Sequence, residues 1–347
     1  MRIGLTYDLR ADYLAAGFGE EETAEFDRVS TIDAIDEALR QLGHQTDRIG
    51  HVHRLVARLA SGERWDLVFN IAEGLRGVSR EAQVPAVLEA FSIPYTFSDP
   101  LVAALTLHKA MTKRVLRDLG VMTAPFCVVE TEDDVRRVDL PYPLFAKPLA
   151  EGTAKGIDGQ SKIDNPRQLA DVCRRLLATF HQPVLVETFL PGREFTVAIT
   201  GTGEEAVAIG TMEIVLRTGA EPHSYTYINK EQCEALCEFP MADPESAAAA
   251  AELSLAAWRG LGCRDAGRVD LRADADGRLH VMELNPLPGL HPTHSDLPMI
   301  ATAVGLSYTE LIGRIVASAA TRRTPPDPRG ARLLAGTGAG IPAETVR

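Results

Sequence analysis

The sequence has few of the features that mark secreted, membrane or nucleic-acid-binding proteins. Its five cysteines are too few and too scattered for a disulfide framework, so we expect a reducing, cytoplasmic location. No apolar run approaches the length of a membrane span, and the opening MRIGLTYDLR lacks the apolar core of a signal peptide. The 36 basic residues are outnumbered by 48 acidic ones, and this net charge of −12 argues against nucleic-acid or anionic-membrane partners. An anionic ligand therefore needs a local basic pocket or metal ions.

Two common nucleotide-binding motifs are also absent. No GxGxxG follows the first predicted strand, so dinucleotide binding is not supported. The GxxxxGK[ST] spacing of a Walker A loop does not occur either. Cys233 and Cys237 form a CxxxC pair, but no second pair stands at metal-ligand spacing, and ordinary packing explains them best.

What the chain does contain is a soluble composition, with 45% hydrophobic residues over 347 positions, which is enough for two or three domains. Strand and helix patterns alternate over residues 1–97, which predicts a parallel sheet covered on both faces. We expect a second unit over 98–185 and a third over 186–320, and residues 321–347 are expected to form a mobile Pro- and Gly-rich tail.

A predicted hairpin over residues 266–289, AGRVDLRADADGRLHVMELNPLPG, is the most informative stretch. Apolar residues alternate with polar ones on both sides of Asp276-Gly277, a dipeptide typical of two-residue turns. If this dipeptide is the loop, Ala275 lies opposite Arg278, and the remaining pairs follow by counting outward.

Four polar residues then share one face of the hairpin. Asp270 falls opposite Glu283, and Arg268 falls opposite Asn285. Two carboxylates directly opposite each other repel unless a cation lies between them, and oxygen ligands suit a hard ion such as Mg²⁺. A solvated outer face would show the same pattern, but the rigid Asn-Pro-Leu-Pro-Gly exit from the second strand favours a site.

Two loops are candidates for ligand contact. Residues 151–156, EGTAKG, carry two glycines and a hydroxyl close to Lys147 and Lys155, a composition that suits either phosphate oxygens or a flexible surface hairpin. Residues 217–243 form a long polar stretch, and loops of that length inside a compact domain are usually functional.

Taken together, four ordered stretches resemble the ATP-grasp superfamily and, within it, the D-alanine–D-alanine ligases. They read PYTFSDPLVAALTLHKAMTK, FAKPLAEGTAKG, VLVETFLPGREFTVAI and GRVDLRADADGRLHVMELNPLPGLHPTHSDLPM, within roughly residues 65 to 315. The resemblance implies an α/β fold with an N-terminal Rossmann-like parallel sheet and two α+β domains that grip ATP. It also implies a homodimer.

The resemblance assigns a role to each matching residue. Those implied to contact the nucleotide are Lys109, Lys147, Gly152, Thr153, Ala154, Glu187, Leu190 and Glu194. Those implied to bind two Mg²⁺ ions are Asp270, Glu283 and Asn285. Lys230 would reach the γ-phosphate, and Arg268 with the backbone N–H of Gly289 would form an oxyanion site. A substrate carboxylate would be phosphorylated by ATP, and an amine would then displace phosphate from the acyl phosphate to leave an amide.

The sequence departs from this family where the amino acids would bind. The family's Gly-Gly-x-Ser/Thr-x-Glu-x-x-Val-Ser stretch is missing after the first strand, and Asp8 is the candidate for its ammonium-binding role. Glu231 stands where the family has a substrate-facing tyrosine, and His294 lies in an altered segment after the hairpin. We therefore expect a carboxylate–amine ligase with altered amino-acid substrates. An authentic D-alanine–D-alanine ligase, a ligase for a non-amine acceptor and a non-catalytic ATP-binding protein are the alternatives.

Overall fold

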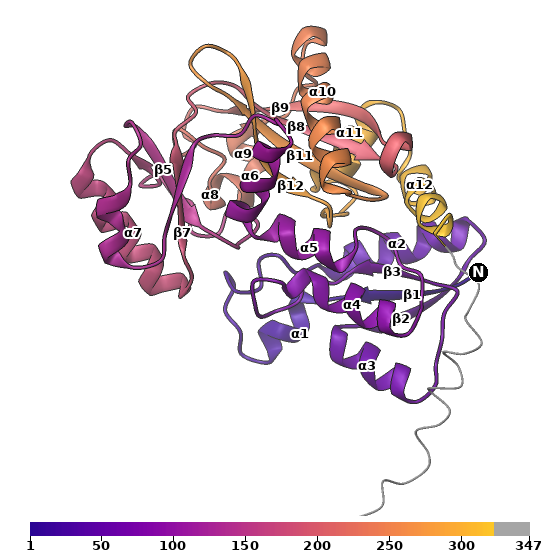
Figure 1. The fold of residues 1–347 in the computed structure, drawn as a ribbon. Helices are drawn as coiled ribbons and strands as arrows, with labels where there is room; N and C mark the ends of the chain where they lie inside the picture. Colours follow the sequence, from indigo (N-terminus) through magenta and orange to yellow (C-terminus); the bar gives the residue numbers. More distant parts are fainter. Residues whose placement is uncertain (323–347) are drawn as a thin grey trace, which may run out of the picture.

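The computed structural model describes residues 1–322, which form three β-sheets with helices around them (Figure 1). The N-terminal sheet has the order β2-β1-β3, and β1 pairs in parallel with both neighbours. Its strands and helices are β1 Arg2–Tyr7, α1 Arg10–Ala15, α2 Val29–Gln41, β2 Gln45–Gly50, α3 Val52–Ala60, β3 Leu67–Ile71 and α4 Gln83–Ala90. This is the parallel N-terminal sheet that the alternating pattern predicts.

The central sheet is antiparallel, with the order β4-β7-β5-β6. Its elements are β4 Phe126–Val129, β5 Leu144–Pro148, β6 Lys162–Ile163, α7 Pro166–Phe180 and β7 Val184–Thr188. The Asn165-Pro166 pair predicts a helix start, and Asn165 is the N-cap of α7, because its side chain accepts a hydrogen bond from the backbone N–H of Gln168. The sheet and α7 enclose a hydrophobic core of their own.

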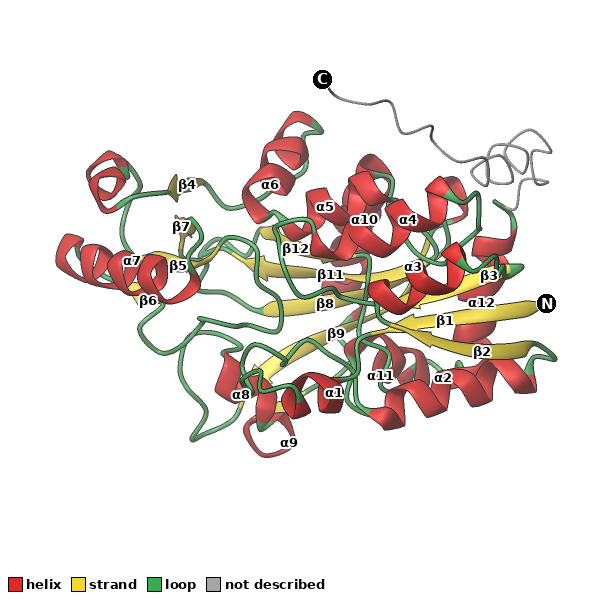
Figure 2. Cartoon of the chain, turned by 90° about the horizontal axis from the view of Figure 1, so that it is seen from below, coloured by secondary structure: helices red, strands yellow, loops and turns green. Residues whose placement is uncertain are grey.

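The C-terminal sheet has five strands in the order β10-β9-β8-β11-β12. Its elements are β8 Glu194–Thr200, β9 Val207–Leu216, α8 Tyr227–Glu231, α9 Cys233–Leu236, β10 Cys237–Glu238, α10 Pro244–Leu261, β11 Ala266–Ala273, β12 Leu279–Asn285, α11 Asp296–Ala303 and α12 Tyr308–Ala320. On β8, Val197 and Ile199 pack with Trp258 of α10, while Ala198 packs towards α11. Helices therefore cover both faces of this sheet (Figure 2).

One hydrophobic core joins the N-terminal and C-terminal sheets. It contains Ile3 and Phe69 of the N-terminal sheet, Ile35 of α2, and Ile300 and Ile315 of α11 and α12. Side chains that are close-packed in one core move together. The N-terminal and C-terminal sheets are therefore fixed relative to each other, whereas the central sheet has a separate core.

Three predicted elements differ from the structure. The helical spacing of residues 99–119 predicts one helix, but the structure has two, α5 Pro100–Leu107 and α6 Lys109–Asp118, because His108 leaves the helical conformation and its ring caps the backbone N–H of Met111. The sequence pattern also predicts one helix over residues 297–318, and this helix is divided at Gly305, whose φ is +83°. Residues 93–96 have the pattern of a strand, but in the structure they form only a single bridge between Val68 and Tyr95.

The expected tail, residues 321–347, lies outside the described residues except for its first two positions. Within residues 1–322, none of the helices is by itself long and apolar enough to cross a membrane, and only the bent pair α11 and α12 meets that test by length and composition.

Candidate active site

The predicted hairpin is present as β11 and β12, and the polar pairs are those expected from counting. Arg268 lies opposite Asn285, and Asp270 lies opposite Glu283. The turn is different, because it has three residues between Asp274 and Arg278 rather than two. The backbone N–H of Asp274 donates to the carbonyl of Arg278, at 2.9 Å, so the expected pairing of Ala275 with Arg278 is wrong.

A bulge in β12 compensates for the extra turn residue. Leu271 lies opposite Val281, whereas Asp270 lies opposite Glu283, so Met282 has no partner on β11. A residue inserted in this way shifts the register by one and redirects a side chain. As a result, Met282 and Glu283 both line the same cavity.

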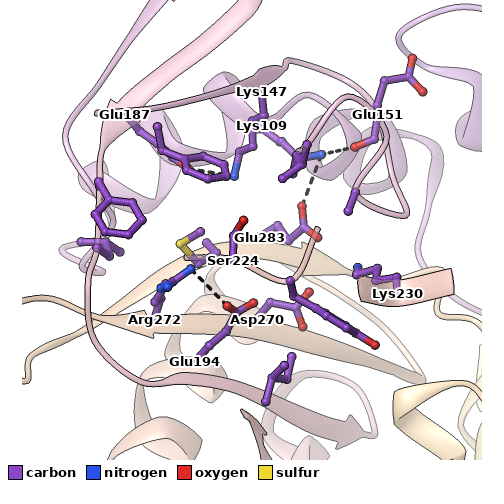
Figure 3. Close-up of a pocket in the computed structure, with 18 of the residues that line it drawn as sticks. Lys109, Lys147, Glu151, Glu187, Glu194, Ser224, Lys230, Asp270, Arg272 and Glu283 are labelled. Atoms are coloured by element: carbon purple, nitrogen blue, oxygen red, sulfur yellow. Dashed lines mark hydrogen bonds and ion pairs between the residues drawn. The ribbon is translucent and has the colours of Figure 1, made fainter. Parts of the chain in front are cut away.

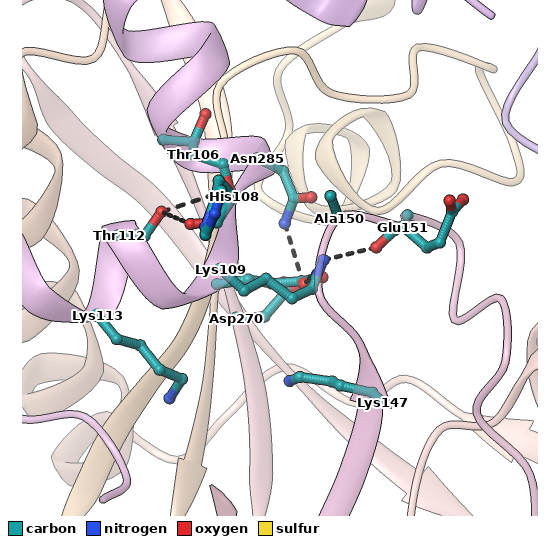
Figure 4. Close-up of polar contacts among 12 residues, drawn as sticks. Thr106, His108, Lys109, Thr112, Lys113, Lys147, Ala150, Glu151, Asp270 and Asn285 are labelled. Carbon is teal, nitrogen blue, oxygen red and sulfur yellow. Dashed lines mark hydrogen bonds and ion pairs between the residues drawn. The ribbon is translucent and has the colours of Figure 1, made fainter. Parts of the chain in front are cut away.

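Asp270 is at the centre of the polar face. It accepts hydrogen bonds from Asn285 Nδ2 at 3.1 Å and from Thr196, and Arg268 Nε lies 3.2 Å away (Figure 4). Burial raises the pKa of Asp270, and the Arg268 guanidinium opposes that rise. For Glu283, burial would also raise the pKa, but Lys109 and other nearby cations hold it well below its ordinary range. An ionised glutamate beside a second carboxylate and an amide oxygen is an oxygen-only donor set.

The central sheet presents its cations to this face. Lys147 on β5 and Lys113 on α6 both form ion pairs with Glu187 on β7, at 2.8 and 2.9 Å, and all three side chains are less than 5% exposed. Burial alone would raise the pKa of Glu187, but the two ammonium groups lower it to about 2. The three groups carry one net positive charge, and Lys147 lines the cavity opposite Asp270 and Glu283 (Figure 3).

The break at His108 positions Lys109. This lysine is the first residue of α6, and its Nζ donates to the carbonyl of Glu151 at 2.5 Å (Figure 4). The same Nζ lies 3.3 Å from Glu283 (Figure 3). It therefore bridges the loop after β5 and the hairpin of the C-terminal sheet. A continuous helix would have tied its backbone N–H to Leu105, whereas the N–H instead donates to the carbonyl of Leu149.

A slot between the central and C-terminal sheets contains most of the residues implied to bind the nucleotide. Its wall is apolar at one end and charged at the other, and Glu194 forms an ion pair with Arg272 at 3.2 Å. The lining residues predicted from sequence are Lys109, Lys147, Ala154, Glu187, Leu190, Glu194, Lys230, Asp270 and Glu283. The slot is about 80 Å³, well below the roughly 300 Å³ at which small-molecule pockets begin, so the groups around it must rearrange to admit a nucleotide.

The glycine-rich loop is held by the N-terminal part of the chain. Glu25 accepts a hydrogen bond from the backbone N–H of Gly152 at 2.6 Å and two from Arg80 at 3.0 Å, and Lys155 lies 3.2 Å away. Thr153, which follows Gly152, has a φ of +49°. The backbone N–H of Gly152 is thus hydrogen-bonded to the Glu25 carboxylate, and it would otherwise be free to bind a phosphate oxygen.

A second and larger cavity, of about 710 Å³, lies next to the slot. Arg268, Asn285 and Gly289 line it, while Lys230 and Asp296 line both cavities. Arg268 is 3.4 Å from Asp296, which fixes its guanidinium at the junction. The two cavities therefore meet at the hairpin, with the lysine-lined slot on one side and the expected oxyanion donors on the other.

Two of the three predicted amino-acid contacts lie on this larger cavity, and one does not. Glu231 and His294 line it, with His294 Nδ1 3.5 Å from Glu234. Asp8 is buried away from both cavities, and its oxygens accept hydrogen bonds from Tyr13 and from the backbone N–H of Gly74. Both oxygens of Asp8 are therefore used within the N-terminal part of the chain.

Sequence reasoning missed several residues of the site. Lys113 is four positions after Lys109, so one helical turn places both on one face, and that spacing could have identified it. Glu73 and Glu81 follow the buried strand β3, at the carboxyl edge of a parallel sheet, where ligands commonly bind. Asp27 gave no local signal, because a backbone bridge to Leu9 brings it to the cavity.

Two antiparallel sheets that enclose a slot, one contributing lysines and the other carboxylates, define an ATP-grasp ligase. The family model described as D-ala D-ala ligase C-terminus matches residues 115–317. The D-alanine–D-alanine ligase of Bordetella petrii is 35% identical over 290 residues, which cover 83% of this chain and 86% of that protein. The chain belongs to the D-alanine–D-alanine ligase family, and it is an ATP-dependent ligase that forms carbon–nitrogen bonds.

Other similar proteins agree with this family. An uncharacterized protein of Sinorhizobium fredii, y4sG, is 33% identical over 301 residues, covering 82% of this chain and 85% of that protein. The structure of the Bacillus anthracis D-alanine–D-alanine ligase complexed with ATP matches with a TM-score of 0.70 at 21% identity, covering 93% of this chain and 98% of that one. The VanG D-Ala:D-Ser ligase of Enterococcus faecalis matches with a TM-score of 0.70 at 19% identity, covering 92% of this chain and 99% of that one. Both structural matches confirm the expected fold.

Proposed function

We propose that this chain joins the carboxylate of one small amino-acid-like substrate to the amine of another through an acyl phosphate, with substrates other than two molecules of D-alanine. The observation that carries the proposal is the junction of the two cavities. The slot supplies cations suited to a triphosphate, and the larger cavity supplies donors suited to a reacting acyl group. Phosphoryl transfer followed by amide formation needs these two environments side by side.

The first step is transfer of the γ-phosphoryl group to a substrate carboxylate. Lys109, Lys147 and Lys230 neutralise charge on the phosphates, and the loop over residues 152–156 covers them. Glu194 would bind the ribose, and Glu187 and Leu190 the base. Since Glu187 is already paired with two lysines, we infer that it orients Lys147 and lines the adenine pocket only at its edge.

The family implies ATP and Mg²⁺, and the residues present fit that ion. Asp270, Glu283 and Asn285 are all oxygen donors on one face, and within residues 1–322 no group of three or more His, Cys, Asp or Glu side chains forms a metal site by itself. A site completed by substrate phosphates is the usual arrangement for Mg²⁺. The three residues would hold two ions, which when bound offset charge on the transferring phosphoryl group.

In the second step an amine attacks the acyl phosphate. Arg268 and the backbone N–H of Gly289 stabilise the tetrahedral oxyanion, and donors of this kind are typically worth about 3 kcal/mol each. The segment over residues 217–243 acts as a lid, because the acyl phosphate hydrolyses if water enters. Lys230 and Tyr225 belong to that lid, and the Lys230 ammonium lies 5.1 Å from the ring of Tyr225.

The altered substrate specificity is supported by the walls of the larger cavity. Glu231 lines this cavity. The volume of the cavity, about 710 Å³, lies in the upper half of the roughly 300–1,000 Å³ range of small-molecule pockets. We further propose that the chain is divided into domains at residues 1–97, 98–185 and 186–320, forms a homodimer and acts in the cytoplasm without nucleic-acid or membrane partners.

Phosphate release from MgATP tests the proposal. The protein is offered amino acids of both configurations, singly, in pairs and with hydroxy acids as alternative acceptors, and product masses are recorded. We expect equal amounts of phosphate, ADP and an amide from a pair other than two D-alanines. Best turnover with D-alanine alone would refute the altered specificity, and products formed only with hydroxy acids would refute amide formation.

A further inference from the structure

The wall that the N-terminal part of the chain contributes to the larger cavity is acidic. Asp27 precedes α2, Glu73 follows β3, and Glu81 lies in the short 3-10 helix Arg80–Ala82. These three carboxylates come from separate segments and line one cavity of about 710 Å³. We call them the acidic wall.

The acidic wall has no cationic partner within the described residues. Neither Glu73 nor Glu81 has an ion pair or side-chain hydrogen bond in residues 1–322, and Asp27 has only the hydroxyl of Thr31. Arg80 lies close by, but its guanidinium donates to Glu25 and to the carbonyl of Ala150 at 2.9 Å. The neighbouring Glu25 is thus fully paired, whereas the acidic wall is not.

Three buried carboxylates without ion pairs are energetically unfavourable unless a ligand neutralises them. Burial and the charge of Glu81 raise the pKa of Glu73, and burial raises the pKa of Glu81 to about 7, although the nearby charge of Arg80 opposes both rises. Burial likewise raises the pKa of Asp27 to about 7. Unpaired acidic groups with raised pKa values in a cavity are typical of binding sites, because an incoming cation restores the charge balance lost on burial.

The spacing of the acidic wall suits an organic cation better than a metal ion. No group of three or more His, Cys, Asp or Glu side chains in residues 1–322 converges closely enough to hold a metal. Carboxylates that line one cavity without converging on a point can each accept a hydrogen bond from an ammonium or guanidinium group.

The acidic wall is close to the reaction centre. The same cavity is lined by Arg268 and Gly289. A substrate whose reacting group lies at Arg268 can therefore extend to the wall. One carboxylate suffices for the α-ammonium group of an amino acid, so three carboxylates leave charge for a second cation.

We infer that one of the two substrates is an amino acid with a basic side chain, whose terminal ammonium or guanidinium group is bound by Glu73 and Glu81. This inference rests on the proposed function, because it assigns the substrate class of the same ligase. It distinguishes this chain from a ligase of two small neutral amino acids by the charge of the cavity.

Matched substrates test the inference directly. Phosphate release by the full-length protein is measured with MgATP and lysine against norleucine, ornithine against norvaline, and arginine against citrulline. Both configurations of each are offered alone and with a panel of second amino acids. We expect kcat/KM for the basic member of a pair to exceed that of its neutral partner by about tenfold or more, the range of a charge-assisted hydrogen bond.

Variants identify the groups responsible. Glu73→Gln and Glu81→Gln keep the side-chain shape and remove the charge, and each is expected to raise KM for the basic substrate by about tenfold while the neutral partner is unaffected. Glu205→Gln is the matched control, because Glu205 is exposed in a turn of the C-terminal sheet far from the cavity. Nucleotide-induced thermal stabilisation of each variant confirms that it is folded.

The outcomes separate the inference from the proposed function. Equal turnover of basic and neutral partners, or equal losses in Glu73→Gln and Glu205→Gln, would overturn the inference and leave the ligase intact. ATP binding without phosphate release for any pair of amino acids would instead overturn the proposed function.

Discussion

At the scale of single residues, the site depends on buried charges that are matched within the protein. Glu187 illustrates this, because it is enclosed by Lys113 and Lys147. Two lysines on one carboxylate keep Lys147 pointed at the slot while leaving a positive charge for an anionic ligand. Removal of either lysine is therefore expected to destabilise the folded protein, because Glu187 stays buried.

Lys113→Met is expected to lower the free energy of unfolding by about 3–5 kcal/mol, since it leaves buried Glu187 with one partner. Denaturant unfolding measures the change. Lys162→Met in the same sheet is the control, because the Lys162–Asp164 ion pair is partly exposed and is worth about 1 kcal/mol or less. Equal effects of the two substitutions would contradict this account.

The pKa of Asp27 gives the substrate affinity a pH dependence. Asp27 faces the hydroxyl of Thr31 and the charges of Asp8 and Glu73, and it lies near Tyr308. Because burial raises its pKa to about 7, it is largely neutral at pH 6 and ionised at pH 8. We expect KM for a basic substrate to fall as the pH rises through 7 in steady-state kinetics. Asp27→Asn is expected to weaken that dependence without abolishing it, because the pKa of Glu81 is also raised to about 7. A pH-independent KM in the unsubstituted protein would contradict this role for the ionisation of the acidic wall.

Arg268→Lys tests the oxyanion site. The substitution keeps the charge that Asp270 and Asp296 require but loses the fixed guanidinium geometry. We expect kcat to fall by about a hundredfold with unchanged nucleotide affinity. Arg278→Lys at the exposed turn of the same hairpin is the control, and a loss of nucleotide binding in Arg268→Lys would assign this arginine to the slot instead.

At the scale of elements, the loop over residues 151–156 is tied to the N-terminal sheet rather than free. We expect Glu25→Gln to increase hydrogen exchange at the Gly152 amide by about tenfold, because a charge-assisted hydrogen bond is lost. Glu21→Gln, a few residues earlier on the exposed surface, is the control. Unchanged exchange at Gly152 would show that Glu25 does not hold the loop.

The hairpin shows how far sequence could predict the site. Alternation correctly gave the pairs Asp270–Glu283 and Arg268–Asn285, because cross-strand register is a local property. The turn length was wrong, and only the bulge at Met282 restored the register. Propensities do not reveal such paired irregularities.

The acidic wall shows where sequence-based prediction reached its limit. Asp27, Glu73 and Glu81 are brought together by the parallel pairing of β1 with β3 and by the bridge from Leu9 to Asp27. These contacts span up to about sixty residues of chain, and no pattern within one segment encodes them. Asp8 was the nearest candidate in sequence, but tertiary structure turned it towards Tyr13 and Gly74.

At the scale of the whole molecule, the hydrophobic cores indicate which parts are fixed to each other and which part can move. The N-terminal and C-terminal sheets share one core, and the larger cavity lies between them. The central sheet packs around its own core and covers the slot. Opening of the central sheet is the expected route for the nucleotide, and it also moves Gly152 and Thr153, which line the larger cavity.

Transfer of oxygen from the acid to phosphate tests the central claim most directly. Substrate amino acids labelled with ¹⁸O in the carboxylate are incubated with the protein and MgATP, and the released phosphate is analysed by mass. An acyl phosphate predicts one ¹⁸O in each phosphate, with ADP and amide in equal amounts. Unlabelled phosphate, or AMP and pyrophosphate in its place, would contradict the account.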